Sequence, residues 1–168
     1  MFKKIASAAV LLGACSASIA AQPGSFYAGG EVGRSKITDV GGHETSFGGF
    51  VGYGFHPNFA VELGQRRLFE RDFRGSGMGA NMRVDQTSLS LLGSQPIGES
   101  FSVYGRLGAA RLQERFSSDG FTNKDSSTKA LYGVGLSYAI TPAVAARVEV
   151  QKISQQASNL STGLSFQF

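Results

Sequence analysis

Apolar and polar side chains alternate along most of this chain, and the alternation is clearest in the last stretch. Leu160, Leu164, Phe166 and Phe168 fall on one face of an extended strand, whereas the opposite face carries only serine, glycine and glutamine. Lipid can cover the apolar face of such a strand, and a polar interior can accept the other face. The pattern therefore predicts a strand of a transmembrane barrel.

The same period of two recurs in seven earlier segments. The predicted strands cover approximately residues 25–36, 45–55, 59–69, 84–95, 101–115, 128–138, 143–153 and 160–168. An even number of strands leaves both chain ends on one side of the membrane, which we expect to be the periplasm. The predicted fold class is all-β, an eight-stranded antiparallel up-and-down transmembrane β-barrel.

The segments between these strands fall into two kinds. Proline and its polar neighbours predict three tight periplasmic turns, at residues 56–58, 96–99 and 141–142. The other four connections are expected to be external, at residues 38–44, 70–83, 116–125 and 155–158. The longest, residues 70–83, is rich in glycine and arginine and has no periodicity. Short turns on one side and longer loops on the other are typical of outer-membrane barrels.

A soluble eight-stranded barrel, such as a lipocalin, would place its apolar face inside. Here the charged faces of the predicted strands are also rich in glycine, while the opposite faces are continuously apolar. An inward apolar face would leave those charges and glycines on the outside. Lipid outside and charge inside is the simpler interpretation.

Residues 1–21 have the pattern of a secretory signal peptide. Lys3 and Lys4 precede an apolar run that ends in small residues, so we predict cleavage near Ala20 or Ala21 and a barrel domain over residues 22–168. Cys15 lies in a sequence that resembles a lipoprotein signal, and lipidation of Cys15 is the alternative to its removal. No later apolar run approaches the ~18 residues that a membrane helix requires.

Composition and charge change this picture little. Removal of the signal leaves no cysteine, so no disulfide is expected. It also lowers the count of Lys and Arg from 16 to 14 against 12 Asp and Glu, which leaves a net charge of +2. So small a charge gives little reason to expect nucleic-acid binding.

Charged residues on the inward faces form the first candidate site. Five of them should lie at similar heights inside the barrel, namely Glu31, Glu62, Arg106, Arg147 and Glu149. We expect them to pair, because an unpaired charge in a narrow interior is costly. The cluster could simply fill the lumen of an eight-stranded barrel. Alternatively, the same pairs could form the gate of a small-solute pore.

Basic residues near the external ends of the strands form the second candidate site. They are Arg34, Arg67, Arg83, Arg111, Arg115 and Lys152. Guanidinium groups at this level could bind the phosphates of lipopolysaccharide. They could equally mark the edge of the hydrocarbon by snorkelling.

The chain offers little for catalysis. His43 and His56 fall at opposite ends of the predicted barrel, and no group of Cys and His has the spacing of metal ligands. The glycine-rich stretches follow strand periodicity and do not form phosphate-binding loops. We expect no enzyme activity, no metal site and no cofactor.

Several motifs resemble the transmembrane domain of the OmpA family, over nearly all of the chain that follows the signal. They cover residues 26–33, 50–53, 61–64, 104–108, 138–142 and 146–149. The resemblance implies a contact between Glu62 and Arg147. The family has a second acid–base pair near its gate, but the matching positions here hold Leu92 and Ser137.

The resemblance also bears on the end of the chain. Leu160, Leu164, Phe166 and Phe168 are similar to the terminal aromatic signal that the outer-membrane assembly machinery reads, and this strand should also pair with the first one. Larger members of the family carry a peptidoglycan-binding domain after the barrel. Because the chain stops at Phe168, we do not expect that anchoring role.

These observations predict a monomeric protein of the bacterial outer membrane with a role in membrane integrity or surface contact, and with lipopolysaccharide as its partner. A gated, low-conductance porin is the first alternative. An adhesin or host-factor binder that uses its external loops, above all the arginine-rich second loop, is the other.

Overall fold

The computed structural model describes residues 23–37, 42–75, 78–118, 121–153 and 157–168. The predicted signal peptide, with Cys15, lies outside them. Eight strands make up almost all of these ranges, and no helix in them is long and apolar enough to cross a membrane. The strands are β1 (Ser25–Ile37), β2 (Gly42–His56), β3 (Phe59–Gly75), β4 (Met78–Pro96), β5 (Phe101–Ser118), β6 (Phe121–Thr141), β7 (Val144–Ile153) and β8 (Ala157–Gln167).

The strands form a closed barrel in which each pairs with its neighbours in the chain and β8 returns to β1. All eight pairings are antiparallel, which confirms the predicted fold class. At the seam, the Phe26 amide donates to the Phe168 carbonyl oxygen at 3.2 Å, and the Phe168 amide donates to the Phe26 carbonyl oxygen at 2.9 Å. Because the barrel is closed, no strand of it has an unpaired edge exposed to lipid.

The register shows that the strands are staggered. A row of cross-strand partners that starts at Phe26 runs through Tyr53, Val61 and the following strands, and it returns to β1 at Lys36 rather than at Phe26. Such a stagger requires strands that tilt against the barrel axis, as in other closed barrels.

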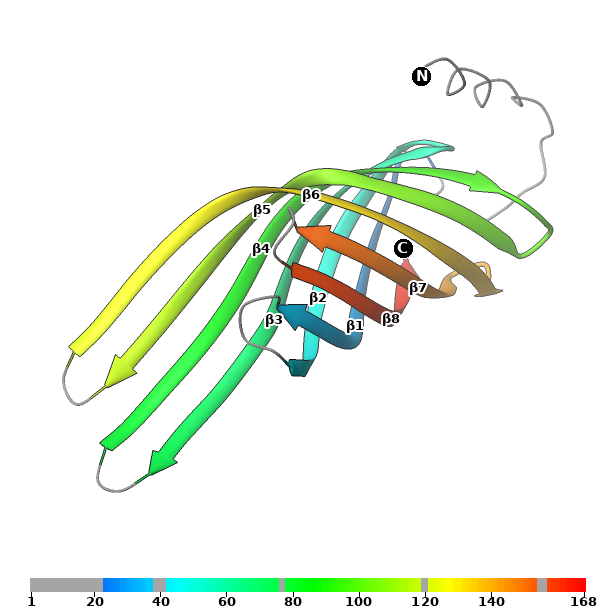
Figure 1. Cartoon of the computed structure of the whole chain (residues 1–168). Coiled ribbons are helices and arrows are strands. Elements are labelled where there is room, and N and C mark those ends of the chain that lie inside the picture. Colours follow the sequence, from blue (N-terminus) through cyan, green and yellow to red (C-terminus); the bar gives the residue numbers. More distant parts are fainter. Residues whose placement is uncertain (1–22, 38–41, 76–77, 119–120, 154–156) are drawn as a thin grey trace, which may run out of the picture.

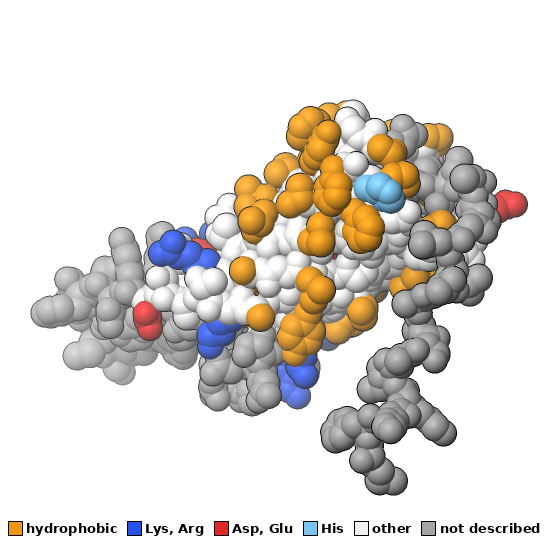
Figure 2. All heavy atoms as spheres, turned by 90° about the horizontal axis from the view of Figure 1, so that it is seen from above, with side chains coloured by type: hydrophobic (Ala, Val, Ile, Leu, Met, Phe, Trp, Pro, Cys, Tyr) orange, Lys and Arg blue, Asp and Glu red, His pale blue; other side chains and the backbone are white. Residues whose placement is uncertain are grey.

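Side chains alternate between the two faces as the sequence predicts. Large apolar residues are exposed on the outside, with Phe26 57%, Leu107 68% and Val134 64% accessible. Figure 2 shows hydrophobic side chains spread over the barrel wall, with Lys and Arg gathered toward one end. The buried side chains include many polar and charged residues, among them Glu62, Arg106 and Glu149, whereas a soluble barrel would place its apolar face inside.

Three short connections lie at one end of the barrel, together with Ser25 and Phe168; we call it the turn end. In one of them, the Asn58 side-chain amide donates to the Ser94 carbonyl oxygen at 2.8 Å. In another, the backbone amides of Ala143 and Val144 donate to Thr141 Oγ1 at 3.3 and 3.1 Å. Polar turn residues therefore satisfy backbone groups here, as their composition predicts.

The opposite end differs from the prediction; we call it the hairpin end. Much of the predicted loops 70–83 and 116–125 is strand, because β3 pairs with β4 as far as Gly75↔Met78 and β5 pairs with β6 as far as Ser118↔Phe121. These two hairpins run past the neighbouring strands in Figure 1. The predicted loops 38–44 and 155–158 are shortened too, since β2 begins at Gly42 and β8 at Ala157.

The extended parts of the two hairpins escape prediction from the sequence for a physical reason. Alternation reports a strand only where one face is buried or covered by lipid. Beyond the closed barrel the sequence shows no such alternation, whereas the backbone groups of β3 and β4 still pair.

Candidate functional site

Inward side chains of four strands meet in the middle of the barrel. Because residues two apart share a face, Glu62 and Arg66 of β3 point inward together, as do Arg147 and Glu149 of β7. Glu31 of β1 and Arg106 of β5 complete the group, which we call the charge layer. All six side chains are at least nine-tenths removed from solvent.

Glu62 is the most connected member of the charge layer. Its carboxylate lies 2.6 Å from Arg106 Nη2 and 2.9 Å from Arg147 Nη1. The Tyr27 hydroxyl donates to the same carboxylate at 3.2 Å. The contact that the resemblance implies between Glu62 and Arg147 is therefore present.

Glu149 is held across the interior by two side chains of β5. Arg106 donates to it through Nε at 2.7 Å and Nη2 at 3.0 Å, and the Tyr104 hydroxyl adds a bond of 2.8 Å. Arg106 thus bridges Glu62 and Glu149, and bonds between charged groups of this kind are short and strong.

Arg66 is a member of the charge layer that the predicted set of five omits. Arg66 Nη2 lies 2.5 Å from Glu31 Oε1, and Arg66 Nη1 donates to Gln151 and Asn159, at 2.9 Å each. Its inward position follows from the same alternation that places Glu62, four residues earlier. The charge layer therefore contains three acids and three arginines, and its formal charges balance.

Two inward glycines make room for the tyrosines that bind the acids. Gly52 is the cross-strand partner of Tyr27, and Gly135 is the partner of Tyr104. A Cβ atom at either glycine would overlap the ring of that tyrosine. Each tyrosine can therefore lie flat over its glycine, with its hydroxyl reaching the charge layer.

An apolar cluster fills the interior on the hairpin side of the charge layer. It consists of Leu68, Val84, Ala110, Leu131 and Ile153, each at most 5% exposed, and we call it the apolar cap. The sequence pattern predicts a polar interior and does not indicate this cluster. The inward face of β7 shows the order of the layers. Along it, Arg147 and Glu149 are followed by Gln151 and then by Ile153 of the apolar cap.

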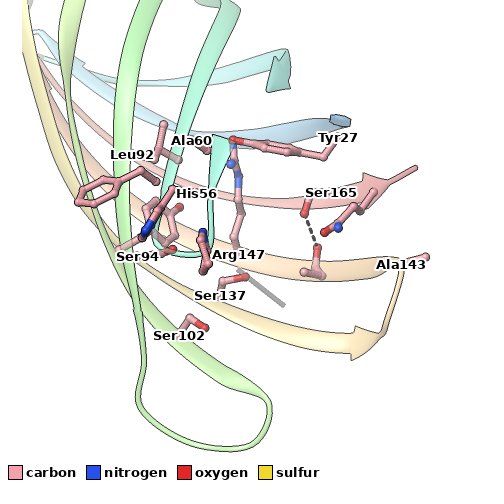
Figure 3. A pocket seen from close by; sticks show the side chains of 15 residues that line it. Tyr27, His56, Ala60, Leu92, Ser94, Ser102, Ser137, Ala143, Arg147 and Ser165 are labelled. Atoms are coloured by element: carbon pink, nitrogen blue, oxygen red, sulfur yellow. Dashed lines mark hydrogen bonds between the residues drawn. The ribbon is translucent and has the colours of Figure 1, made fainter. Parts of the chain in front are cut away.

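A cavity of about 80 Å³ lies on the other side of the charge layer, toward the turn end. Serines from several strands surround it, including Ser94, Ser102 and Ser137, and Arg147 also lines it (Figure 3). Leu92 borders it and is buried among aromatic side chains. Leu92 and Ser137 therefore lie beside the charge layer but supply no charge to it.

The charge layer is a network in which buried charges share partners. Arg147 has two acids within reach, with Glu31 4.0 Å from its Nη2, and its guanidinium stacks 3.4 Å from the centre of the Phe50 ring. Glu62 in turn has two arginines. Such a network keeps each buried charge compensated, which is the condition for tolerating it in a narrow interior.

Comparison with known proteins agrees with this geometry. The family described as the outer membrane protein beta-barrel domain matches residues 6–168 of the chain. The chain belongs to this family. It is 31% identical to outer membrane protein P5 of Haemophilus influenzae over 91% of the chain, and 30% identical to outer membrane protein A of Salmonella typhi over 98% of the chain.

The alignments cover 52% and 54% of these two relatives, so the chain spans about half of their length. Among solved structures, the N-terminal barrel domain of OprF from Pseudomonas aeruginosa superposes with a TM-score of 0.63 at 17% identity, covering 88% of this chain and all of that one. That likeness concerns the fold. As a member of the outer membrane protein beta-barrel family, the chain is a small barrel protein of the bacterial outer membrane, and lipid contacts its apolar wall.

The predicted basic residues lie toward the hairpin end of this wall, and we call them the basic rim. Arg34, Arg111 and Lys152 are exposed, whereas Arg67 and Arg83 are half-buried. The side chain of Arg115 lies outside the described residues, although its backbone pairs with Arg83.

Arg67 of the basic rim has an outward acid beside it. Its Nε lies 3.2 Å from Asp85 Oδ1, and its guanidinium is 5.4 Å from the centre of the Phe47 ring. Part of its charge is therefore compensated within the protein.

The residues of the predicted assembly signal all lie on the lipid-facing side of β8 or at its end. Leu160, Leu164 and Phe166 are exposed, and Phe168 is 77% accessible. Of the two histidines, His56 is the last residue of β2, where its Nδ1 accepts a bond of 3.2 Å from the Asn58 backbone amide. The side chain of His43 lies outside the described residues.

Proposed function

We propose that this chain is a monomeric, structural barrel of the outer membrane with a closed lumen, and that it is neither a channel nor an enzyme. The observation that carries the proposal is the pairing of Glu62 with both Arg106 and Arg147, at 2.6 and 2.9 Å, next to the apolar cap. An eight-stranded barrel is just wide enough for its side chains to fill it.

A gate that exchanges partners between two acid–base pairs has little support in this chain. Arg147 would need a second acid on the turn side, where the matching positions hold Leu92 and Ser137. Moving a buried arginine away from its carboxylate without a new partner is costly. Even with Arg147 displaced, the apolar cap would still fill the lumen.

Planar-bilayer recording tests the closed lumen. We expect purified, folded protein to show no conductance steps, and we expect Arg147→Ala to stay silent as well. Arg67→Ala, on the outer face of the barrel, is the matched arginine control. Steps in the wild type that grow in Arg147→Ala but not in Arg67→Ala would contradict the proposal and favour the gated, low-conductance porin.

The orientation and the lipid partner belong to the same proposal. We place the turn end and both chain ends of the barrel domain in the periplasm, so that the hairpin end faces outward. The exposed Arg34, Arg111 and Lys152 would then lie at the level of the outer-leaflet headgroups, where lipopolysaccharide phosphates are available. The barrel-assembly machinery would recognise the apolar face of β8, which ends at Phe168.

A role in surface contact is the second candidate, and the length of the two hairpins favours it. β3 pairs with β2 only as far as Phe47↔Arg67, yet it continues to Gly75 alongside β4. The hairpin therefore projects beyond the closed barrel. Deletion of residues 71–82 should reduce cell adhesion while the barrel still folds. Unchanged adhesion would argue against an adhesin that uses this hairpin.

A further inference from the structure

The lipid-facing wall is hollowed where two outward glycines meet. Gly93 of β4 and Gly105 of β5 are direct cross-strand partners. A Cβ atom at Gly105 would find nothing within 4 Å, so the space above it is open. The hollow measures about 780 Å³, and Phe59, Leu91, Leu107 and Val134 are among the side chains that line it. We call it the glycine groove.

The glycine groove extends between the two ends of the barrel. Phe59, at one end of it, is the first residue of β3 at the turn end. Lys152 and Ser158, at the other end, lie near the hairpin-end limits of β7 and β8. The groove is therefore apolar along its length and polar, with one cation, at its hairpin end.

Lys152 gives the groove its chemical preference. It is exposed and forms no ion pair with the described part of the chain, unlike Arg67, which has Asp85 beside it. An ammonium group at the end of an apolar groove is complementary to a molecule that joins a phosphate to a hydrocarbon chain. We propose that the glycine groove binds one acyl chain of lipid A, with a lipid A phosphate on Lys152.

This proposal rests on the proposed orientation, which places Lys152 in the outer leaflet, and it adds a binding site to the basic rim. Bulk lipid is as apolar as the groove, so burial alone selects nothing. Selection arises from the close contacts that a chain gains between Leu107 and Val134, and from the charge at the end. A symmetric pair of barrels joined at the groove would instead bring two copies of Lys152 close together, which is unfavourable.

A second hollow repeats the arrangement on another part of the wall. Gly49, Val51 and Leu63 line it, as does Arg67 of the basic rim. Its volume is about 680 Å³. Because Asp85 also lines this hollow and pairs with Arg67, we expect the glycine groove to bind a phosphorylated lipid more tightly.

Native mass spectrometry of the barrel, released from phosphatidylcholine nanodiscs that contain lipid A, tests the proposal. Gly105→Leu places its Cβ atom in open space, fills part of the groove and should lower retained lipid A by about tenfold through lost contacts. Lys152→Gln should lower it by about threefold, as expected for one exposed ion pair. Ala109→Leu adds bulk to the same face of β5 outside the groove and should change nothing. Heat-modifiable migration on gels verifies that each variant is folded.

The outcomes separate this site from the basic rim. Equal retention by Gly105→Leu and wild type overturns the groove, whereas the basic rim is tested separately by substituting Arg34, Arg67 and Arg111. Equal retention of phosphatidylglycerol and lipid A by the wild type overturns the assignment to lipid A. A cross-linked dimer that Gly105→Leu abolishes would show that the groove binds a second copy, and the proposal would be wrong.

Discussion

Glu62 determines how the barrel interior responds to mutation, because two arginines and a tyrosine converge on its carboxylate. Glu62→Gln removes one charge and keeps the shape, so it leaves Arg106 and Arg147 under-compensated in a buried site. We expect the free energy of unfolding to fall by about 3–5 kcal/mol. Urea titration of the barrel in lipid vesicles measures this change.

Asp85→Asn is the matched control for that substitution. Asp85 pairs with Arg67 on the outer face, where both side chains are partly exposed. The cost there should be only about 0–1 kcal/mol. Equal costs for the two substitutions would mean that the charge layer is not a compensated buried network.

The tyrosine above Gly135 gives a second prediction for single residues. Gly135→Ala forces a Cβ atom into the Tyr104 ring and should cost about 1–3 kcal/mol of the free energy of unfolding. In a Tyr104→Ala background the penalty should largely disappear, because neighbouring substitutions are not additive. Gly105→Ala, which faces open space, is the control. The same penalty in both backgrounds would exclude the overlap as its cause.

Strand parity correctly predicts which face of the barrel a residue lies on where its side chain is charged or strongly apolar. It places the five predicted charges inside the barrel and the apolar band outside. The predicted set omits Arg66, although Arg66 shares its face with Glu62. The apolar cap could not be found in this way, since an inward Leu68 or Ile153 near the end of a strand looks like any other apolar strand residue. Only the cross-strand register shows which side chains meet.

At the scale of elements, the strands and the three tight turns follow from alternation and proline, whereas the lengths of the hairpins do not. β4 begins at Met78, and the predicted strand begins at residue 84. Between those positions the sequence shows no alternation of apolar and polar residues. Strand length outside the membrane is set by backbone pairing, to which hydropathy is insensitive.

β8 gives a prediction at this scale, because the strand both closes the barrel and presents an aromatic residue at its end. Phe168→Ala keeps the backbone bonds to Phe26 but removes the exposed ring. We expect it to abolish most of the assembled barrel in cells, while refolding of the purified protein into vesicles stays close to that of the wild type. Heat-modifiable migration of membrane fractions measures assembly.

Gln167→Ala, on the inward face of the same strand, is the control and should assemble normally. If both variants lose assembly equally, the aromatic ring is not what the assembly machinery reads. If Phe168→Ala also fails to refold after purification, its role is in closure rather than recognition.

At the scale of the whole molecule, the proposed binding of lipopolysaccharide by the basic rim gives a prediction. Replacing Arg34, Arg67 and Arg111 with Gln should lower the lipopolysaccharide that co-purifies with the barrel by about tenfold, if each exposed pair contributes its usual fraction of a kcal/mol. Added salt should weaken binding to the wild type.

The triple replacement with Lys separates charge from geometry. It keeps three cations but loses the planar fork that binds a phosphate through two bonds, so lipopolysaccharide should fall to an intermediate level. Unchanged co-purification in the Gln variant would show that these residues only mark the edge of the hydrocarbon.

The hydrogen bonds between Phe26 and Phe168 make the barrel a ring of strands with no architectural first or last member. A rearranged chain that joins Phe168 to Ser25 through a short linker and opens at Gly98, an exposed turn residue, would contain the same eight pairings. Nearby ends make proteins tolerant of such circular permutation. The rearranged chain would fold in vesicles but would end in a different strand. The order of the strands along the chain would therefore affect delivery to the membrane and leave the architecture unchanged.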